Sequence, residues 1–255
     1  MTATPAGMTY ADYLKLDQLL TAQQPLSDLH DEMLFIVIHQ TKELWMKQML
    51  HELTLAIPLV ETDSFAAAYK ALSRISRIQS VMTLSWEVLS TLTPVDYLAF
   101  RHVLGTSSGF QSAQFRELEF RFGLKDPAYL NHYAEGTDER ALLDSALERP
   151  SLRDASHGAL ERAGFDLGDR SVAALAAAWL HVYRDAERWF ELYQLAEKLV
   201  DLDDSLASWR HKHVLTVERI IGSRTGTGGS AGASYLRSTL DKRVFPELWA
   251  LRTDL

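Results

Sequence analysis

His213 stands on the apolar side of a predicted helix, where a metal ligand in an apolar pocket would lie. The helix is predicted over residues 202–221, and His213 is four residues from both Trp209 and Val217 on its apolar seam. Because four residues turn an α-helix by about 400°, His213 projects within about 40° of each. His211 points roughly 200° away and cannot share an ion with it. Two interpretations follow: a hydrogen-bonded core histidine or an axial metal ligand.

Two further pairs of residues, each four apart, share a helix face. Phe35 and His39 bring a phenyl ring beside an imidazole, which suits a flat aromatic ligand and equally suits ordinary core packing. Tyr97 and Arg101 bring a phenol beside a guanidinium. This pair can clamp a carboxylate through the bidentate fork of arginine, or it can simply face solvent.

The segment 224–230 is rich in glycine but is not a nucleotide-binding loop. It lacks the Lys-Ser/Thr ending of a P-loop and follows a predicted helix instead of a strand. Its glycines allow close approach of the backbone to a ligand, and the hydroxyl of Thr227 can bind a polar headgroup. A mobile loop without a ligand is the alternative. The six histidines besides 39, 211 and 213 have no recognisable metal-binding spacing.

Composition excludes several classes of site and partner. The chain has no cysteine, which excludes disulfides, zinc–thiolate centres and thiolate-ligated haem. Its formal charge of −8 argues against a nucleic-acid partner. Residues 1–7 do not resemble a signal peptide, and the longest apolar run, 172–180, is too short to span a membrane. A cytoplasmic protein is therefore expected.

Helical periodicity organises the elements that must position these residues. Long helices are predicted over residues 28–57, with Pro58 as the stop, over 64–92, 171–199 and 202–221, the last ending at Gly222. Thr93-Pro94 begins a further helix, and another ends near Phe122. Residues 124–170 form a variable insertion with short helices near 138–148 and 152–163, and a closing helix starts near Ser234. We predict one all-α, helical-bundle domain over residues 1–255, with a pocket between long helices.

Several strings, in order along the chain, resemble the tryptophan 2,3-dioxygenase family. The likeness extends from about Tyr10 to Thr253 and is weakest across 124–170. The strings are Tyr10–Leu14, His30–Gln40 with Glu43-Leu44-Trp45, Gly105–Ser112, Trp209–His213, Gly226–Ser230 and Phe245–Leu248.

The resemblance implies a helical homotetramer, a dimer of dimers, with one haem b in each subunit. His213 matches the axial ligand of the haem iron, and its other ring nitrogen is expected to donate a hydrogen bond. The resemblance implies three further residues in the haem pocket, namely Trp86, Ser108 and Gly109.

The resemblance also implies a substrate site for L-tryptophan. His39 matches the distal histidine that accepts the indole N–H, and we expect it to orient the substrate without acting as an obligatory base, because indole is a very weak acid. The other matched positions surround the same substrate. Phe35 forms a wall, Tyr97, Arg101 and Thr227 hold the amino-acid headgroup, and Tyr10, Tyr13 and Leu14 reach into the pocket of a neighbouring subunit.

The implied reaction uses O2 on ferrous haem to cleave the indole C2–C3 bond, giving N-formyl-L-kynurenine with both oxygen atoms retained. Two alternatives remain. A related haem enzyme could act as a monooxygenase on a modified tryptophan, and a haem-binding sensor could lack catalysis. The Tyr97–Arg101 pair argues against the sensor, since a receptor for a diatomic gas needs no carboxylate clamp.

Overall fold

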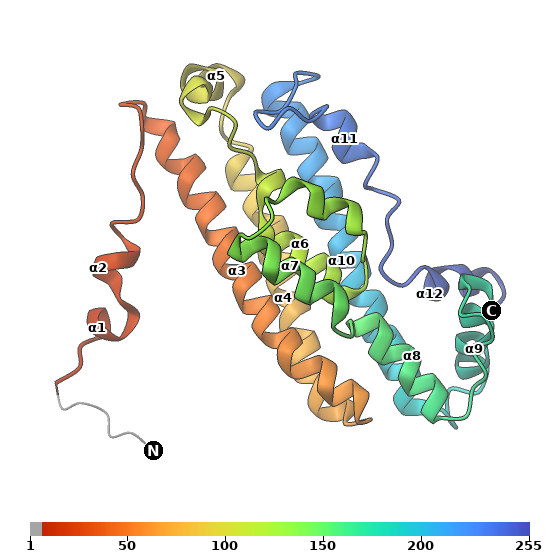
Figure 1. Ribbon diagram of the computed structural model, residues 1–255. Helices are drawn as coiled ribbons and strands as arrows, with labels where there is room; N and C mark the ends of the chain where they lie inside the picture. The colour runs from red at the N-terminus through yellow and green to blue at the C-terminus, as the bar shows by residue number, and fades with distance from the viewer. Residues whose placement is uncertain (1–6) are drawn as a thin grey trace.

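Three long helices form the body of the molecule. The computed structural model describes residues 7–255, and within them it has helices and no strand, so the all-α prediction is confirmed. Helices α3 (His30–Glu61), α4 (Phe65–Leu89) and α10 (Phe190–Ile221) lie side by side, and α4 packs against both of the others (Figure 1). Leu53, Ile75 and Leu195, one from each helix, are fully buried in the core between them.

Shorter helices surround this core. They are α1 (Tyr10–Leu14), α2 (Leu16–Leu19), α5 (Pro94–Phe100), α6 (Ala113–Phe122), α7 (Asp138–Glu148), α8 (Leu152–Arg162), α9 (Val172–Arg184), α11 (Ala233–Arg237) and α12 (Pro246–Ala250), with short 3-10 helices at η1 (Arg101–Leu104), η2 (Gly109–Gln111), η3 (Pro127–His132) and η4 (Leu251–Thr253). As predicted, Thr93 caps α5, where its hydroxyl accepts from the Asp96 N–H, and Gly222 ends α10 with a positive φ.

The prediction that Pro58 ends the first long helix is wrong, because α3 continues to Glu61 with Pro58 inside it. A proline in a helix interior costs about 3 kcal/mol, since it lacks an N–H and crowds the preceding turn. Ile57 and Val60 are buried on either side of it. Burial of two such side chains contributes about 1.5–3 kcal/mol each, which offsets the cost of the proline.

The predicted break between residues 199 and 202 is also wrong. The chain breaks earlier, between Arg184 and Phe190, and α10 then runs without interruption. Leu195, Leu199 and Leu202 are buried at helical spacing, so the apolar seam passes straight through the expected break.

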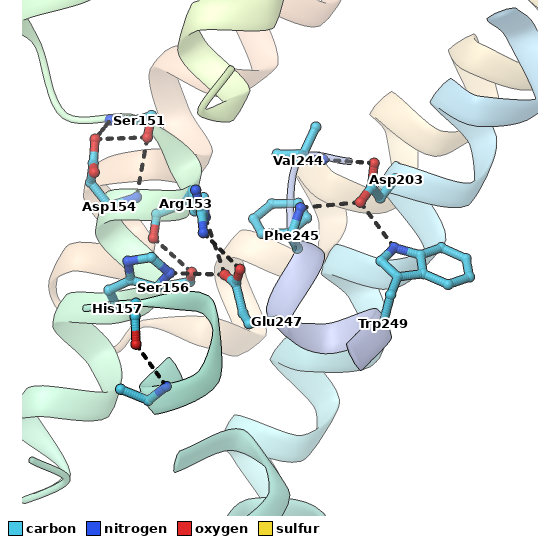
Figure 2. Close-up of polar contacts among 12 residues, drawn as sticks. Ser151, Arg153, Asp154, Ser156, His157, Asp203, Val244, Phe245, Glu247 and Trp249 are labelled. Atoms are coloured by element: carbon cyan, nitrogen blue, oxygen red, sulfur yellow. Dashed lines mark hydrogen bonds and ion pairs between the residues drawn. The ribbon is translucent and has the colours of Figure 1, made fainter. Parts of the chain in front are cut away.

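The C-terminal segment is tied to the bundle by two buried carboxylates (Figure 2). Asp203 of α10 accepts hydrogen bonds from the Val244 and Phe245 N–H groups at 3.0 and 3.1 Å. Glu247 of α12 receives Arg153 at 2.8 Å and His157 at 2.9 Å, both from α8. Within residues 124–170, therefore, α8 is anchored to the C-terminal segment, and its Leu152 and Leu160 enter the main core.

The N-terminal arm lies beside the bundle instead of inside it. Helices α1 and α2 stand apart from the long helices in Figure 1, and neither has a buried residue. Tyr10 and Tyr13 are 76% and 74% exposed. The prediction that residues 1–7 do not form a signal peptide concerns mainly residues 1–6, which lie outside the described residues. From Gly7 onward, no helix is long and apolar enough to cross a membrane.

Candidate functional site

A cavity of about 550 Å³ opens between the three long helices, at the end where the loops containing Ser108 and Thr227 meet. Its volume lies in the range typical of small-molecule and cofactor sites, about 300–1,000 Å³. Most of the residues predicted for cofactor or substrate line it. They are Phe35, His39, Trp86, Tyr97, Ser108, Gly109, His213 and Thr227.

His213 is held in the cavity wall by α10 and is neutral. Burial, together with the nearby Lys42 amine and then His39, lowers the pKa of His213 to about 3. A neutral imidazole keeps a lone pair free for a metal. Its ring stacks on Trp86, with centroids 4.3 Å apart and planes 10° from parallel. Within residues 7–255 neither ring nitrogen has a hydrogen-bond partner, so the expected donor bond finds no protein acceptor there.

His39 presents a hydrogen-bond acceptor to the cavity. Its Nδ1 lies 2.7 Å from the Phe35 carbonyl oxygen, one turn earlier on α3. A carbonyl only accepts, so Nδ1 carries the proton and Nε2 carries the lone pair. Burial lowers the pKa of His39 to about 4, against the opposing effect of the Phe35 bond. The imidazole is therefore neutral near pH 7, in a fixed tautomer suited to receiving an N–H group.

Phe35 supplies a flat apolar surface beside this acceptor. Its ring centroid is 4.2 Å from that of His39 and 5.9 Å from that of Tyr97. Tyr97 itself is buried, and that burial raises the pKa of its phenol. The wall formed by Phe35, His39 and Tyr97 thus offers an apolar face, one acceptor and one hydroxyl that stays protonated.

Arg101 does not line the cavity in this structure. Its guanidinium donates to the carbonyl of Thr225, two residues before Thr227. Thr227 lines the cavity, and its hydroxyl donates to the Ser107 carbonyl at 2.5 Å. Both candidate headgroup-binding side chains are therefore engaged by backbone oxygens. Of the carboxylate clamp predicted from spacing, Tyr97 lines the cavity and Arg101 does not.

The loop containing Thr227 packs tightly on the segment containing Ser108. A Cβ added to Gly228 would lie 2.7 Å from the Ser108 Cβ, so only glycine fits there without movement. The Ser108 hydroxyl in turn accepts from the Phe110 N–H at the start of η2. Thr227, Ser108 and Gly109 therefore form one continuous wall, built from segments more than a hundred residues apart.

Tyr10, Tyr13 and Leu14 do not approach this cavity. All three lie in α1, on the arm beside the bundle, and none lines the cavity of the same chain (Figure 1). Their exposed rings and side chain are available to another molecule instead.

Sequence reasoning missed the charged groups around the cavity. Lys42 lies three residues after His39 on the same face of α3, a spacing visible in the sequence. Glu119 of α6 accepts from Arg116 and, at 2.6 Å, from Arg210. Arg210 also donates to the Lys242 carbonyl at 2.7 Å. Since Arg210 is three residues before His213, this buried network fixes the face that α10 turns to the cavity.

The donor set fits a haem. Residues 7–255 contain no cluster of three or more metal-ligating side chains, so a bare ion would lack ligands. A single neutral imidazole beside a large cavity instead suits a metal that brings its own equatorial ligands. The rest of the lining is largely apolar, as a porphyrin requires, and includes Met46, Met82, Leu89, Phe115, Val217 and Ile220.

Comparison with known proteins places this geometry in a family. The profile of the tryptophan 2,3-dioxygenase family matches residues 1–171 and 165–255. A protein of Caulobacter vibrioides named tryptophan 2,3-dioxygenase is 60% identical, over 97% of this chain and 98% of its own length. A relative of the same name from Cupriavidus necator is 52% identical, over 97% of this chain and 88% of its own length. Another, from Bacillus thuringiensis, is 51% identical, over 98% of this chain and 93% of its own length. The chain therefore belongs to the tryptophan 2,3-dioxygenase family.

Proposed function

We propose that this protein is a haem-dependent dioxygenase that cleaves the indole C2–C3 bond of L-tryptophan with O2 to give N-formyl-L-kynurenine. The observation that carries the proposal is the pairing of two neutral histidines in the lining of one cavity: His213, which has no hydrogen-bond partner among the described residues, and His39, whose Nδ1 is bonded to the Phe35 carbonyl so that Nε2 is the acceptor. The full-length likeness to enzymes of this name supports it.

Haem b, held through His213, would supply the iron that binds O2 and the electrons that activate it. The protein supplies position and exclusion of water. His39 Nε2 accepts the indole N–H, and Phe35 packs against the indole ring. With a pKa of about 4, His39 is too weak a base to deprotonate indole, so its role is to orient the substrate. Trp86, Ser108 and Gly109 complete the haem pocket.

Recognition of the amino-acid headgroup falls to Tyr97, Arg101 and Thr227. The Arg101 guanidinium binds the carboxylate and Thr227 the ammonium and carboxylate, with the Tyr97 hydroxyl as a further donor. Because Arg101 and Thr227 hydrogen bond to backbone carbonyls here, we infer that the substrate headgroup exchanges places with those carbonyls on binding. A sensor of a diatomic gas would need none of these groups.

The active assembly is proposed to be a homotetramer built as a dimer of dimers, with Tyr10, Tyr13 and Leu14 of one subunit entering the pocket of another. The exposure of all three, on an arm that packs little against its own bundle, supports this arrangement. Residues 1–255 as a single domain, 124–170 as a variable insertion, a cytoplasmic location and the lack of a nucleic-acid or membrane partner stay predictions.

The test is a single-turnover reaction. Ferrous, haem-loaded protein is mixed with L-tryptophan in the absence of oxygen and is then exposed to ¹⁸O2. The mass of the product is measured by mass spectrometry. We expect N-formyl-L-kynurenine with both oxygen atoms labelled. A product with one labelled atom would instead establish the monooxygenase alternative. No feature of the cavity favours that alternative. A haem spectrum that L-tryptophan leaves unchanged, without product, would refute the proposal.

A further inference from the structure

No hydrogen bond from a residue between 7 and 255 sets the orientation of His213. A metal-bound histidine normally donates its second ring N–H to a carboxylate or carbonyl, which fixes the rotation of the ring. Neither nitrogen of His213 has such a partner among the residues described. The torsion that rotates a histidine ring is intrinsically broad. The ring therefore needs another constraint, and the two rings against it are Trp86, stacked at 4.3 Å, and Trp209, tilted at 5.3 Å.

Trp86 in turn is held by contact with Lys42. The indole N–H of Trp86 is buried and has no hydrogen-bond partner in the part of the chain that is described. The Lys42 amine lies 2.8 Å from the centroid of the Trp86 ring. An amine over an indole is attracted to the ring face, as a cation–π contact when charged and as an N–H···π contact when neutral. Lys42, Trp86 and His213 come from α3, α4 and α10, so each long helix contributes one member.

The position of Lys42 over the Trp86 ring lowers the free energy of unfolding of the protein. Its side chain is 5% exposed, and Nζ has no hydrogen-bond partner within residues 7–255. Burying an amine without such a partner is unfavourable, and burial lowers the pKa of Lys42 to about 6. Residues that lower stability while lining a functional cavity are often retained for function.

We propose that Lys42 and Trp86 are positioning residues that set the rotation of the His213 imidazole against the haem iron, in place of the usual hydrogen bond. The proposal rests on the proposed function, because it requires His213 to be the iron ligand. Lys42 keeps the indole flat against the imidazole, and the imidazole then meets the iron in one orientation.

The test uses haem-loaded protein and the iron–histidine stretching band of the ferrous form, measured by resonance Raman spectroscopy. Lys42→Met and Trp86→Leu should each shift and broaden the band. Because Lys42 acts through Trp86, the double variant should match Trp86→Leu alone. Lys42→Arg, which keeps N–H groups over the ring, should restore the wild-type band. Lys47→Met is the matched control: it makes the same substitution at an exposed position of α3 and should leave the band unchanged.

Thermal unfolding of the haem-free protein separates positioning from ordinary packing. Lys42→Met should unfold at a higher temperature than wild type, since it removes a buried amine without a partner. An unchanged Raman band in Lys42→Met, additive shifts in the double variant, or a lower unfolding temperature would each overturn the proposal. A wild-type protein with haem but no iron–histidine band would instead overturn the assignment of His213, and this inference with it.

Discussion

Gly228 offers the sharpest test of how the substrate wall is built. In Gly228→Ala the new Cβ would lie 2.7 Å from the Ser108 Cβ, whereas carbon atoms in contact prefer about 3.5–4.0 Å. The two segments must therefore separate by about 1 Å. A displacement of that size near reacting groups costs on the order of 10²-fold in rate, or about 2.7 kcal/mol. We expect that loss in kcat/KM for L-tryptophan at matched haem content, because Thr227 and Ser108 both belong to the wall that is displaced.

The assay is steady-state formation of N-formyl-L-kynurenine at matched haem content, with a rescue variant as control. In Gly228→Ala/Ser108→Gly the clashing Cβ and hydroxyl are both gone, and the next neighbour, the Thr106 carbonyl oxygen, lies at an ordinary 3.7 Å. Loss of the Ser108 cap to glycine costs only a few tenths of a kcal/mol. The double variant should recover most of the activity. A Gly228→Ala enzyme within about threefold of wild type, or a double variant no better than the single, would refute the steric argument.

Four further outcomes are expected. His213→Ala should fail to retain haem, and a fully loaded, active variant would refute the ligand assignment. His39→Ala should lose about tenfold in kcat/KM, the worth of one hydrogen bond, and complete loss of turnover would make it an obligatory base. Glu119→Ala leaves two buried arginines without their carboxylate and should lower the free energy of unfolding in urea by about 3–5 kcal/mol. The pKa of Glu247 is lowered because hydrogen bonds from His157 and Arg153 outweigh the opposing effect of burial. The stabilising effect of the Glu247 carboxylate is present above its unfolded pKa of about 4.3 and is lost as the pH falls through the folded pKa. In Glu247→Gln, the free energy of unfolding should therefore fall less steeply as the pH is lowered.

The missed elements of the fold share one cause. The predicted helix end at Pro58 and the predicted break near residue 200 both rest on local sequence preference alone. In the structure, Ile57 and Val60 are buried around the proline, and Leu199 and Leu202 are buried across the expected break. Local propensity differs by at most a few kcal/mol, and burial against other helices, which no single segment reveals, outweighs it.

The candidate site divides in the same way. Relations within one helix followed from spacing: His213 projects to the cavity and His211 does not, and the His39 imidazole lies beside the Phe35 ring one turn before it. Relations between helices did not follow. No spacing indicated that Lys42 lies over Trp86, or that Arg101 turns to Thr225.

By itself, then, the sequence determined the helical class, the caps at Thr93 and Gly222, the family, and which histidine of the pair 211 and 213 faces the cavity. These depend on angles and strings within continuous segments. Only the tertiary structure decided that His213 lacks a hydrogen-bond partner in the described chain, that its ring stacks on Trp86, and that Lys42 lies over Trp86. The reason is physical: helical geometry fixes where a side chain points, while packing of three helices against one another decides what it meets.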